Sequence, residues 1–482
     1  MNGSLLTAQC RRRASTVILM ALMLVGAREV CGAQPDSNRA SRGTGTFERL
    51  FAADSLWNSR PVDPTLGADV IPKSDYFPNV AAGAWSTGLF LAKPDDQPMH
   101  IHGLPGKAGV WDVDAEQFRD VTVPRWPADL APASEADGHA DIVDPVLGIV
   151  QSFWQLKKVD DQWIAGLYAW TPLKGRGWGD PAHYYQGARA AAVPAAAGLM
   201  RKHEINDGDT MYRHALAISL TYNALSANPA YIFPATSADG DASTTNTGKI
   251  PEGALLMLPP SFEAQRLATP ELRKVAETLK VFGGYVVDRN VGTPFMIYVE
   301  IGAHFRLHKT GWNNATASDL DHIRESLRQV VATKGWVDAD DRAFTPRKDL
   351  NLLSMRGPWR LQSGPAAGSF ETLRQAVVFP ATQQRTVQMN DSGRSMQPVS
   401  WAIPVVGKVY RLHATTTGGA RLRVALRDKT GGAPLYDSGE LGDGEARTFK
   451  WPANAGAVVY AISGTSGPST VGGDLVAVDE IH

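Results

Sequence analysis

Side chains that can transfer protons or neutralise charge gather in two segments of the sequence. The first segment contains His139, and the second contains Arg201, Glu204, Tyr212 and His214. A cation, a base and an acid are what an enzyme needs to cleave a uronate polysaccharide by β-elimination. The cation neutralises the uronate carboxylate, the base removes the adjacent proton and the acid protonates the leaving oxygen. The sequence therefore favours a polysaccharide lyase.

Each role has a candidate residue. Arg201 fits the cation, His139 or His214 fits the base, and Tyr212 or Tyr185 fits the acid. A turn at residues 206–208 separates the two arms of the second segment, so a hairpin would bring Arg201 or Glu204 toward His214. We expect Arg201, Glu204, His139 and His214 to converge on one cleft.

Trp154 follows the His139 segment by one hairpin length, and we expect it to line the same cleft as a stacking platform for substrate. Tyr185 and Asp288 are further candidate substrate-binding residues. The alternative is structural: Arg201 and Glu204 would form an ion pair, and the histidines would lie in unrelated places.

Two other functions remain open. A glycoside hydrolase would use two carboxylates, with Glu204 paired with Asp144, Asp288 or Glu300. A non-catalytic protein that binds carbohydrate or matrix would instead use its aromatic faces. The sequence holds 13 Trp, which suits either role.

Several classes of protein are excluded. There is no Gly-rich phosphate loop, no zinc-binding His-Glu-x-x-His helix and no Gly-x-Ser-x-Gly elbow, and we expect neither cofactor nor metal. Lys and Arg number 48 against 49 Asp and Glu, for a net charge of -1. That balance argues against a nucleic-acid partner, so a polysaccharide is the expected one.

The N-terminus resembles an export signal. Arg11–Arg13 precede an apolar run from Ala14 to Ala27, and Cys31-Gly32-Ala33 provides a cleavage site. The run is too short for a membrane span, and no later stretch is long and apolar enough. We expect residues 1–33 to be a signal peptide and the protein to be secreted or periplasmic. Both cysteines, Cys10 and Cys31, lie within it, so the mature chain has no disulfide.

Short apolar runs separated by Gly, Pro, Asn and Asp predict a mostly β protein. We expect a linker over 34–46, then a jelly-roll or sandwich-like catalytic domain over 47–337. An interdomain crossing over 338–374 and an accessory β-sandwich over 375–482 follow.

Two packing helices interrupt the β pattern of the main domain. Thr269 and Pro270 start the first helix, which ends at Gly283. Ser318 is expected to cap the second, whose apolar stripe continues through Val330 and Val331. Between them, residues 284–288 predict a buried strand that ends in a carboxylate, Asp288.

A set of motifs in fixed order extends over about residues 51–305. It comprises Phe51–Asn58, His139, Ile142-Val143-Asp144, Trp154, Ala197–Arg201, Glu204, Gly208, His214-Ala215-Leu216, Pro234-Ala235, Tyr285 and Asp288. This pattern resembles a largely uncharacterised, polysaccharide-lyase-like group of secreted bacterial β-rich proteins. The resemblance implies the same fold but no particular reaction. Tyr212 and Arg213 depart from the pattern, because a shorter apolar lead-in precedes the histidine in that group.

Overall fold

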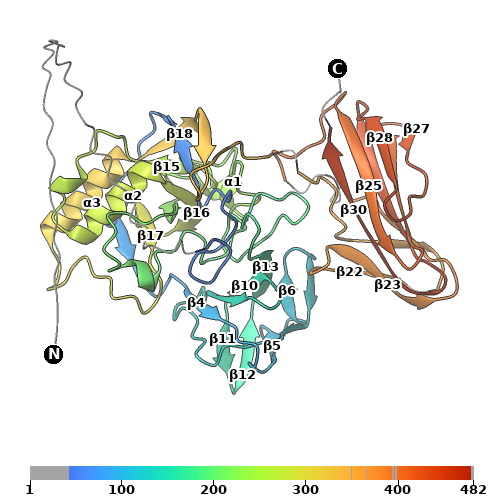
Figure 1. Cartoon of the computed structure of the whole chain (residues 1–482), viewed down its shortest axis with the longest axis horizontal. Helices are drawn as coiled ribbons and strands as arrows, with labels where there is room; N and C mark the ends of the chain where they lie inside the picture. The colour runs from blue at the N-terminus through green and yellow to red at the C-terminus, as the bar shows by residue number, and fades with distance from the viewer. Residues whose placement is uncertain (1–42, 349, 366, 393–395, 397–398, 479–482) are drawn as a thin grey trace, which may run out of the picture. The chain divides into compact units, whose positions relative to one another are not determined.

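The computed structural model describes residues 43–348, 350–365, 367–392, 396 and 399–478. The predicted signal peptide and most of the predicted linker lie outside these residues. The described chain is mostly β, with only short helical segments between strands, so the predicted fold class is confirmed (Figure 1). No helix among the described residues is long and apolar enough to cross a membrane.

A seven-stranded mixed sheet forms the centre of the main region. Its inner strands pair β14 in parallel with β16 and antiparallel with β17. In sheet order the strands are β2 (Thr65–Leu66), β18 (Arg328–Ala332), β15 (Leu255–Met257), β16 (Gly284–Asn290), β14 (Leu216–Thr221), β17 (Phe295–Tyr298) and β3 (Asn79–Ala81).

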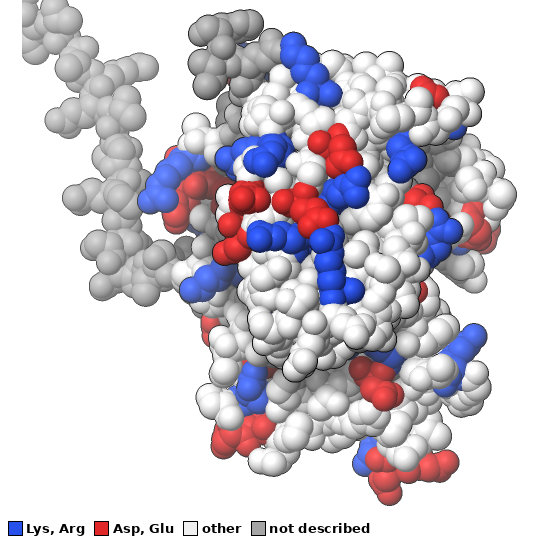
Figure 2. Space-filling model, turned by 90° about the vertical axis from the view of Figure 1, so that its right-hand side faces the viewer, with Lys and Arg blue, Asp and Glu red and all other residues white. Residues whose placement is uncertain are grey.

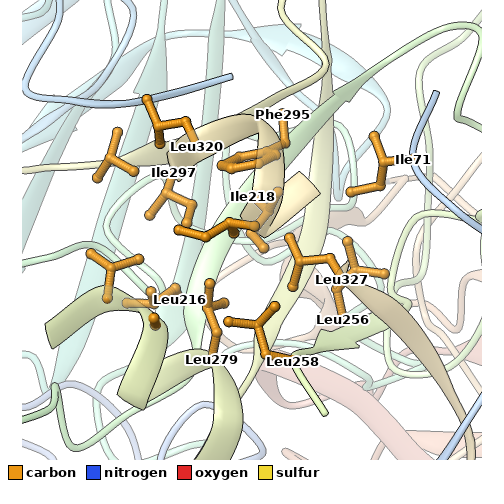
Figure 3. Packing of buried hydrophobic residues seen from close by; sticks show 14 of the residues in the cluster. Ile71, Leu216, Ile218, Leu256, Leu258, Leu279, Phe295, Ile297, Leu320 and Leu327 are labelled. Atoms are coloured by element: carbon orange, nitrogen blue, oxygen red, sulfur yellow. The ribbon is translucent and has the colours of Figure 1, made fainter. Parts of the chain in front are cut away.

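Helices α2 (Pro270–Val281) and α3 (Asn314–Ser326) cover one face of this sheet. Leu279 and Leu320 from the helices pack with Leu216, Ile218 and Ile297 from the strands (Figure 3). On each helix the buried apolar residues recur at helical spacing, and on each strand they occupy alternate positions. Each element therefore buries one apolar stripe.

The first predicted helix is confirmed, and the second is shorter than predicted. The Thr269 hydroxyl accepts a hydrogen bond from the Leu272 amide, as an N-cap does. The second helix starts five residues earlier than expected, because Asn313 rather than Ser318 caps it, by accepting from two backbone amides. It ends at Ser326, and Val330 and Val331 lie in β18 instead, where β-branched residues are favoured.

The other face of the sheet packs on aromatic residues. Trp57 stacks on Trp178 with ring centroids 4.7 Å apart, and both contact the Tyr285 ring edge-on. All three side chains are buried in a second apolar cluster, which also includes Tyr298.

A β-bulge in β16 changes which face its last residues use. Ile218 pairs with Val286, but Ser219 pairs with Asp288, so Val287 is an extra residue. The predicted strand is therefore confirmed, and its terminal Asp288 shares a face with Ser219 and Tyr298 rather than with the helices.

Smaller sheets and helical turns complete the main region. A six-stranded sheet contains β4 (Gly88–Leu91), β9 (Ala140–Asp144), β10 (Ile149–Trp154), β13 (Leu167–Pro172), β6 (Val110–Asp112) and β7 (Gln117–Arg119). A four-stranded sheet contains β11 (Lys157–Val159), β12 (Gln162–Ala165), β5 (Met99–Gly103) and β8 (Val121–Val123). A three-stranded sheet contains β1 (Arg60–Val62), β19 (Gly335–Val337) and β20 (Ala343–Phe344). The helical turns are η1 (Lys202–Glu204), α1 (Ala242–Thr245) and η2 (Ala264–Arg266).

The C-terminal part forms two five-stranded antiparallel sheets around one apolar core. One contains β21 (Arg360–Ser363), β24 (Val387–Asn390), β29 (Ala455–Ile462), β26 (Arg421–Asp428) and β27 (Pro434–Asp437). The other contains β22 (Ser369–Glu371), β23 (Ala376–Thr382), β30 (Gly467–Ala477), β25 (Val409–Thr417) and β28 (Ala446–Lys450). Strands β21 and β22 come from the predicted crossing, so the sandwich takes in residues before 375.

Charges of both signs are interspersed on the face shown in Figure 2. This mixture agrees with the balance of basic and acidic residues in the sequence.

Replacement of Leu279 by Ala should lower the free energy of unfolding by about 2–5 kcal/mol, because it leaves a cavity between α2 and the sheet. The Val291→Ala variant is the control, since that side chain is 91% exposed and should change stability by less than about 0.5 kcal/mol. Urea denaturation of both variants measures the difference. Equal effects would contradict the core assignment.

Candidate functional site

The structure divides the predicted site residues into two groups. Arg201, Glu204, Tyr212 and His214 lie together around η1, and we call them the His214 group. His139 instead neighbours Arg189 and the Phe153 backbone. The structure therefore does not bring the two histidines into the predicted single cleft, because His139 and His214 lie in different surroundings.

His214 is held by hydrogen bonds at both ring nitrogens. Nδ1 lies 2.8 Å from the Ala215 carbonyl oxygen, and Nε2 lies 3.2 Å from Glu204 Oε2. Both partners can accept a hydrogen bond, so each ring nitrogen of His214 faces an acceptor of the protein. Burial opposes ionisation of Glu204, but the charge and hydrogen bond of His214 lower its pKa to about 2. Neither ring nitrogen of His214 is left facing a substrate.

Arg201 is also fully committed to the fold. Its Nε donates to Glu300 at 2.9 Å, its Nη1 donates to the Phe47 carbonyl at 2.7 Å, and its guanidinium lies over the Phe47 ring. The side chains of Arg201 and Glu300 are 6% and 3% exposed. Through these contacts Arg201 holds the start of the domain against η1. Because Glu300 is paired with Arg201, it is not available for a catalytic carboxylate pair.

Tyr212 is buried against helix α2. Its amide donates to Thr278 Oγ1, and the Lys274 ammonium lies 4.6 Å from the centre of its ring. Lys274 also donates to Asp207 and to the Glu204 carbonyl. Burial raises the pKa of Tyr212. The His214 group thus joins a turn to a helix, so its role is structural. The ion pairs differ from the predicted one, because Arg201 pairs with Glu300 and Glu204 with His214.

Asp288 belongs to a second group of charged side chains, formed with Arg189, Asp239, Glu252 and Tyr185, which we call the Asp288 group. The Asp288 carboxylate accepts from Arg189 Nη1 at 3.1 Å and from the Arg289 amide. Arg189 is 2% exposed and stacks on the Tyr298 ring at 3.9 Å, whereas the Asp288 side chain is 17% exposed. The Arg189–Asp288 ion pair therefore extends from the buried interior to the partly exposed surface.

Asp239 and Glu252 form a carboxyl–carboxyl pair. Glu252 Oε1 accepts a hydrogen bond from the Asp239 amide at 3.2 Å, and the two carboxyls act electrostatically on each other. Burial, together with the neighbouring carboxylates, raises the pKa of Glu252 well above its usual value, and burial raises that of Asp239. Two carboxyls this close resist ionisation of both, so we expect the pair to hold one proton.

The sheet register sets Glu252 beside Asp288. Leu255 pairs with Tyr285 in the antiparallel pair of β15 and β16, and the Gly253 amide donates to the Val286 carbonyl. The same register, continued past the end of β15, places Glu252 opposite Asp288. Burial, opposed by Arg189 and assisted by the charge of Asp239, raises the pKa of Asp288 to about 7.

Aromatic side chains flank these carboxyls. Tyr185 is half-buried, and burial followed by the charges of Glu252, Asp288 and Asp239 raises its pKa. Trp154 is also half-buried, and its indole nitrogen donates to Asp137 at 3.0 Å. Asp137 in turn acts electrostatically on Arg189 and Asp288.

His139 lies behind this group rather than in it. Its side chain is 2% exposed, and burial together with the charge of Arg189 lowers its pKa well below the usual value. The nearby Asp141 is fully buried and accepts from the Ala196 amide at 2.6 Å. A neutral, enclosed histidine is suited to packing, not to contact with substrate.

Asp144, another hydrolase candidate, forms a two-pronged ion pair with Arg125 and is fully buried. The carboxyls that the structure does bring together include Asp239 and Glu252, which the sequence analysis missed. Asp239-Gly240 and Pro251-Glu252-Gly253 look like ordinary turns in sequence, and nothing there links them to Asp288. Among the described residues, no group of three or more His, Cys, Asp or Glu side chains is arranged to hold a metal.

No protein-family model and no curated protein matches the sequence. Similar solved structures include accessory secretory proteins 1, 2 and 3 of Streptococcus pneumoniae, at 12% identity over 28% of this chain and 99% of that one, with a TM-score of 0.20. A fucose-binding module of Streptococcus pneumoniae is 11% identical over 28% of this chain and 100% of that one, with a TM-score of 0.17. The CBM22-1–GH10 modules of Clostridium thermocellum xylanase 10B are 10% identical over 27% of each chain, with a TM-score of 0.17. At these values the likeness carries no argument about the function of this chain.

Replacement of Glu204 by Gln should destabilise the protein at neutral pH, because it removes the buried carboxylate that pairs with His214 and accepts from the Arg201 amide. The folded pKa of Glu204 is lowered, so its contribution is present above the unfolded value of about 4.3 and is lost as the pH falls toward 2. The melting temperature should therefore fall at pH 7 and converge with wild type in acid. Exposed Glu135→Gln is the control, and a deficit independent of pH would contradict the ion pair.

Replacement of Glu252 by Gln should have the opposite pH dependence. The folded pKa of Glu252 is raised, so wild type loses stability as the pH rises above about 4.3, where the unfolded carboxyl ionises. Gln keeps a hydrogen-bond donor toward Asp239 without titrating. The melting temperature of the variant relative to wild type should rise between pH 4 and pH 8, and a flat difference would contradict the shared proton.

Proposed function

We propose that the chain is an exported enzyme that cleaves glycosidic bonds of a polysaccharide with the carboxyl groups of the Asp288 group. The observation that carries this proposal is the meeting of Asp239, Glu252 and Asp288, all with raised pKa values, where Asp239 and Asp288 are partly exposed and Glu252 is buried behind them. Carboxyls of this kind are costly to assemble, and they serve acid–base chemistry where they occur.

Asp288 is the candidate general acid. Its pKa of about 7 keeps a large fraction protonated near neutral pH, and its side chain reaches the surface. A carboxylic acid in that state can protonate the leaving oxygen of a glycosidic bond. Arg189 orients the group by holding one of its oxygens.

The Asp239–Glu252 pair is the candidate base. One shared proton leaves one negative charge on the two carboxyls, and this charge can take a proton from an attacking water. The half-buried rings of Tyr185 and Trp154 beside the carboxyls suit the apolar faces of sugars. Together these features support hydrolysis.

A second candidate reaction is β-elimination from a uronate. It is favoured by Arg189, whose Nε and Nη2 are buried without a hydrogen-bond partner. That edge of a guanidinium has the geometry to bind a carboxylate with two parallel hydrogen bonds. A carboxylate of the Asp239–Glu252 pair would then remove the proton next to the uronate carboxylate, and Tyr185, which its raised pKa keeps protonated, would donate its proton to the leaving oxygen as the C–O bond breaks. The export signal predicted over residues 1–33 supports action on a polymer outside the cytoplasm.

The Asp288→Asn and Glu252→Gln variants should each lose roughly 10²–10⁴-fold in kcat/KM, as expected for removal of an acid or base. Asp161→Asn is the control, because that side chain is 97% exposed. A panel of acidic and neutral polysaccharides supplies the substrates. New reducing ends without ultraviolet absorbance indicate hydrolysis, and unsaturated uronate ends indicate elimination. Wild-type turnover by both variants, or no cleavage of any polymer, would contradict the proposal.

The pH profile gives an independent check. Because Asp288 must be protonated to act as the acid, kcat/KM should fall as the pH rises above about 7. In the control variant Asp161→Asn the profile should be unchanged. A profile that keeps rising to pH 9 would rule out Asp288 as the acid.

A further inference from the structure

A groove runs along the same strand pair that carries the carboxyls. It has a volume of about 420 Å³, and its lining includes Gly253 and Leu255 from one strand and Tyr285 from the other. A smaller hollow of about 130 Å³ adjoins it, with Leu56 and Phe233 among the residues that line both. The larger volume lies within the range of about 300–1,000 Å³ typical of ligand sites.

The groove and the candidate catalytic carboxyls are close along the strands. Glu252 precedes Leu255 by three residues, and Asp288 follows Tyr285 by three, on the paired strand. At about 3.3 Å per residue this separation is roughly 10 Å. The bulge at Val287 turns Asp288 to the same sheet face as Tyr285. A chain bound in the groove can therefore extend to the carboxyls.

Aromatic and apolar side chains form much of the lining. The half-buried rings of Phe233 and Trp336 line the larger part, whereas Tyr285 and Trp178 border the two hollows from the apolar core. The indole nitrogen of Trp178 and the hydroxyl of Tyr285 are buried without hydrogen-bond partners. Rings with polar tips are the usual surface for sugars, which present one apolar face and many hydroxyls.

Cations line the same groove. Arg176, Lys334, Arg347 and Lys348 contribute to the two hollows, whereas Asp54 is the acidic residue of their described lining. Lys348 lies 5.2 Å from the centre of the Phe233 ring, and Lys334 pairs with Asp63. The lining therefore carries an excess of positive charge over an aromatic surface.

We propose that this groove binds an acidic polysaccharide, so that its aromatic rings contact sugar faces and its cations contact carboxylate or sulfate groups. This inference rests on the proposed function in one respect: the bound polymer is the one that the Asp288 group cleaves. The occupant follows from charge complementarity, because a neutral glycan would make no use of the cations.

Binding can be measured separately from cleavage. Isothermal titration calorimetry of the full mature chain carrying Glu252→Gln would use an oligogalacturonate as the acidic probe and a cello-oligosaccharide of equal length as the neutral probe. The acidic probe should bind at least tenfold more tightly, and an increase in salt from 0.05 to 0.5 M should weaken its binding, because salt screens the charges.

Groove variants locate the binding. Arg176→Ala/Lys348→Ala should weaken acidic-probe binding by at least tenfold, and Trp336→Ala should weaken binding of both probes. The matched control is Lys93→Ala/Lys157→Ala, which removes two exposed cations elsewhere. Thermal melts would verify that each variant is folded.

The outcomes separate the two proposals. Equal affinity for both probes, no binding of either, or acidic-probe binding unaffected by the groove variants would overturn the groove proposal. Groove-dependent binding with undiminished cleavage by Glu252→Gln would leave the groove proposal standing and overturn the proposed function. Normal binding with lost cleavage supports both.

Discussion

The need to accommodate a buried guanidinium shapes the main region. Arg189 is 2% exposed, and an uncompensated charge in that position would cost several kcal/mol. The Asp288 carboxylate and the Tyr298 ring meet this need, and both come from the central sheet. The same burial that requires Asp288 raises its pKa to about 7. The position of Asp288 beside Arg189 and the raised pKa of its carboxyl thus have one electrostatic origin.

Much of the fold was predictable because it depends on local patterns. The apolar stripe and the Thr269 cap define α2, and a run of Tyr285, Val286 and Val287 defines a buried strand. The end of α3 was not predictable in the same way. Val330 and Val331 continue its helical spacing, and only their pairing in β18 with strands distant in sequence shows that they are not helical. The mixed sheets depend on the same long-range pairing.

The candidate site was predictable only in part. Asp288, Tyr185 and Trp154 were identified from the sequence, but their partners Asp239, Glu252 and Arg189 come from turns with no distinctive pattern. The densest polar segment, from Arg201 to His214, was more conspicuous in sequence and has structural contacts instead. The density of polar residues along the chain does not distinguish side chains that pair with each other from side chains that face solvent, because both arrangements place several charges close together.

The extra residue in β16 has a consequence for how this protein can vary. Up to Val286 the strand alternates between an apolar helix side and an aromatic side, and the bulge resets that alternation by one. If the strand kept Val287 but lost the bulge, Ser219 would pair with Val287 and Leu220 with Asp288, and the carboxylate would point at the helices in an apolar cluster. Deletion of residue 287 would instead leave Asp288 opposite Ser219. The inherited constraint here is therefore the register of Asp288 rather than the presence or identity of residue 287.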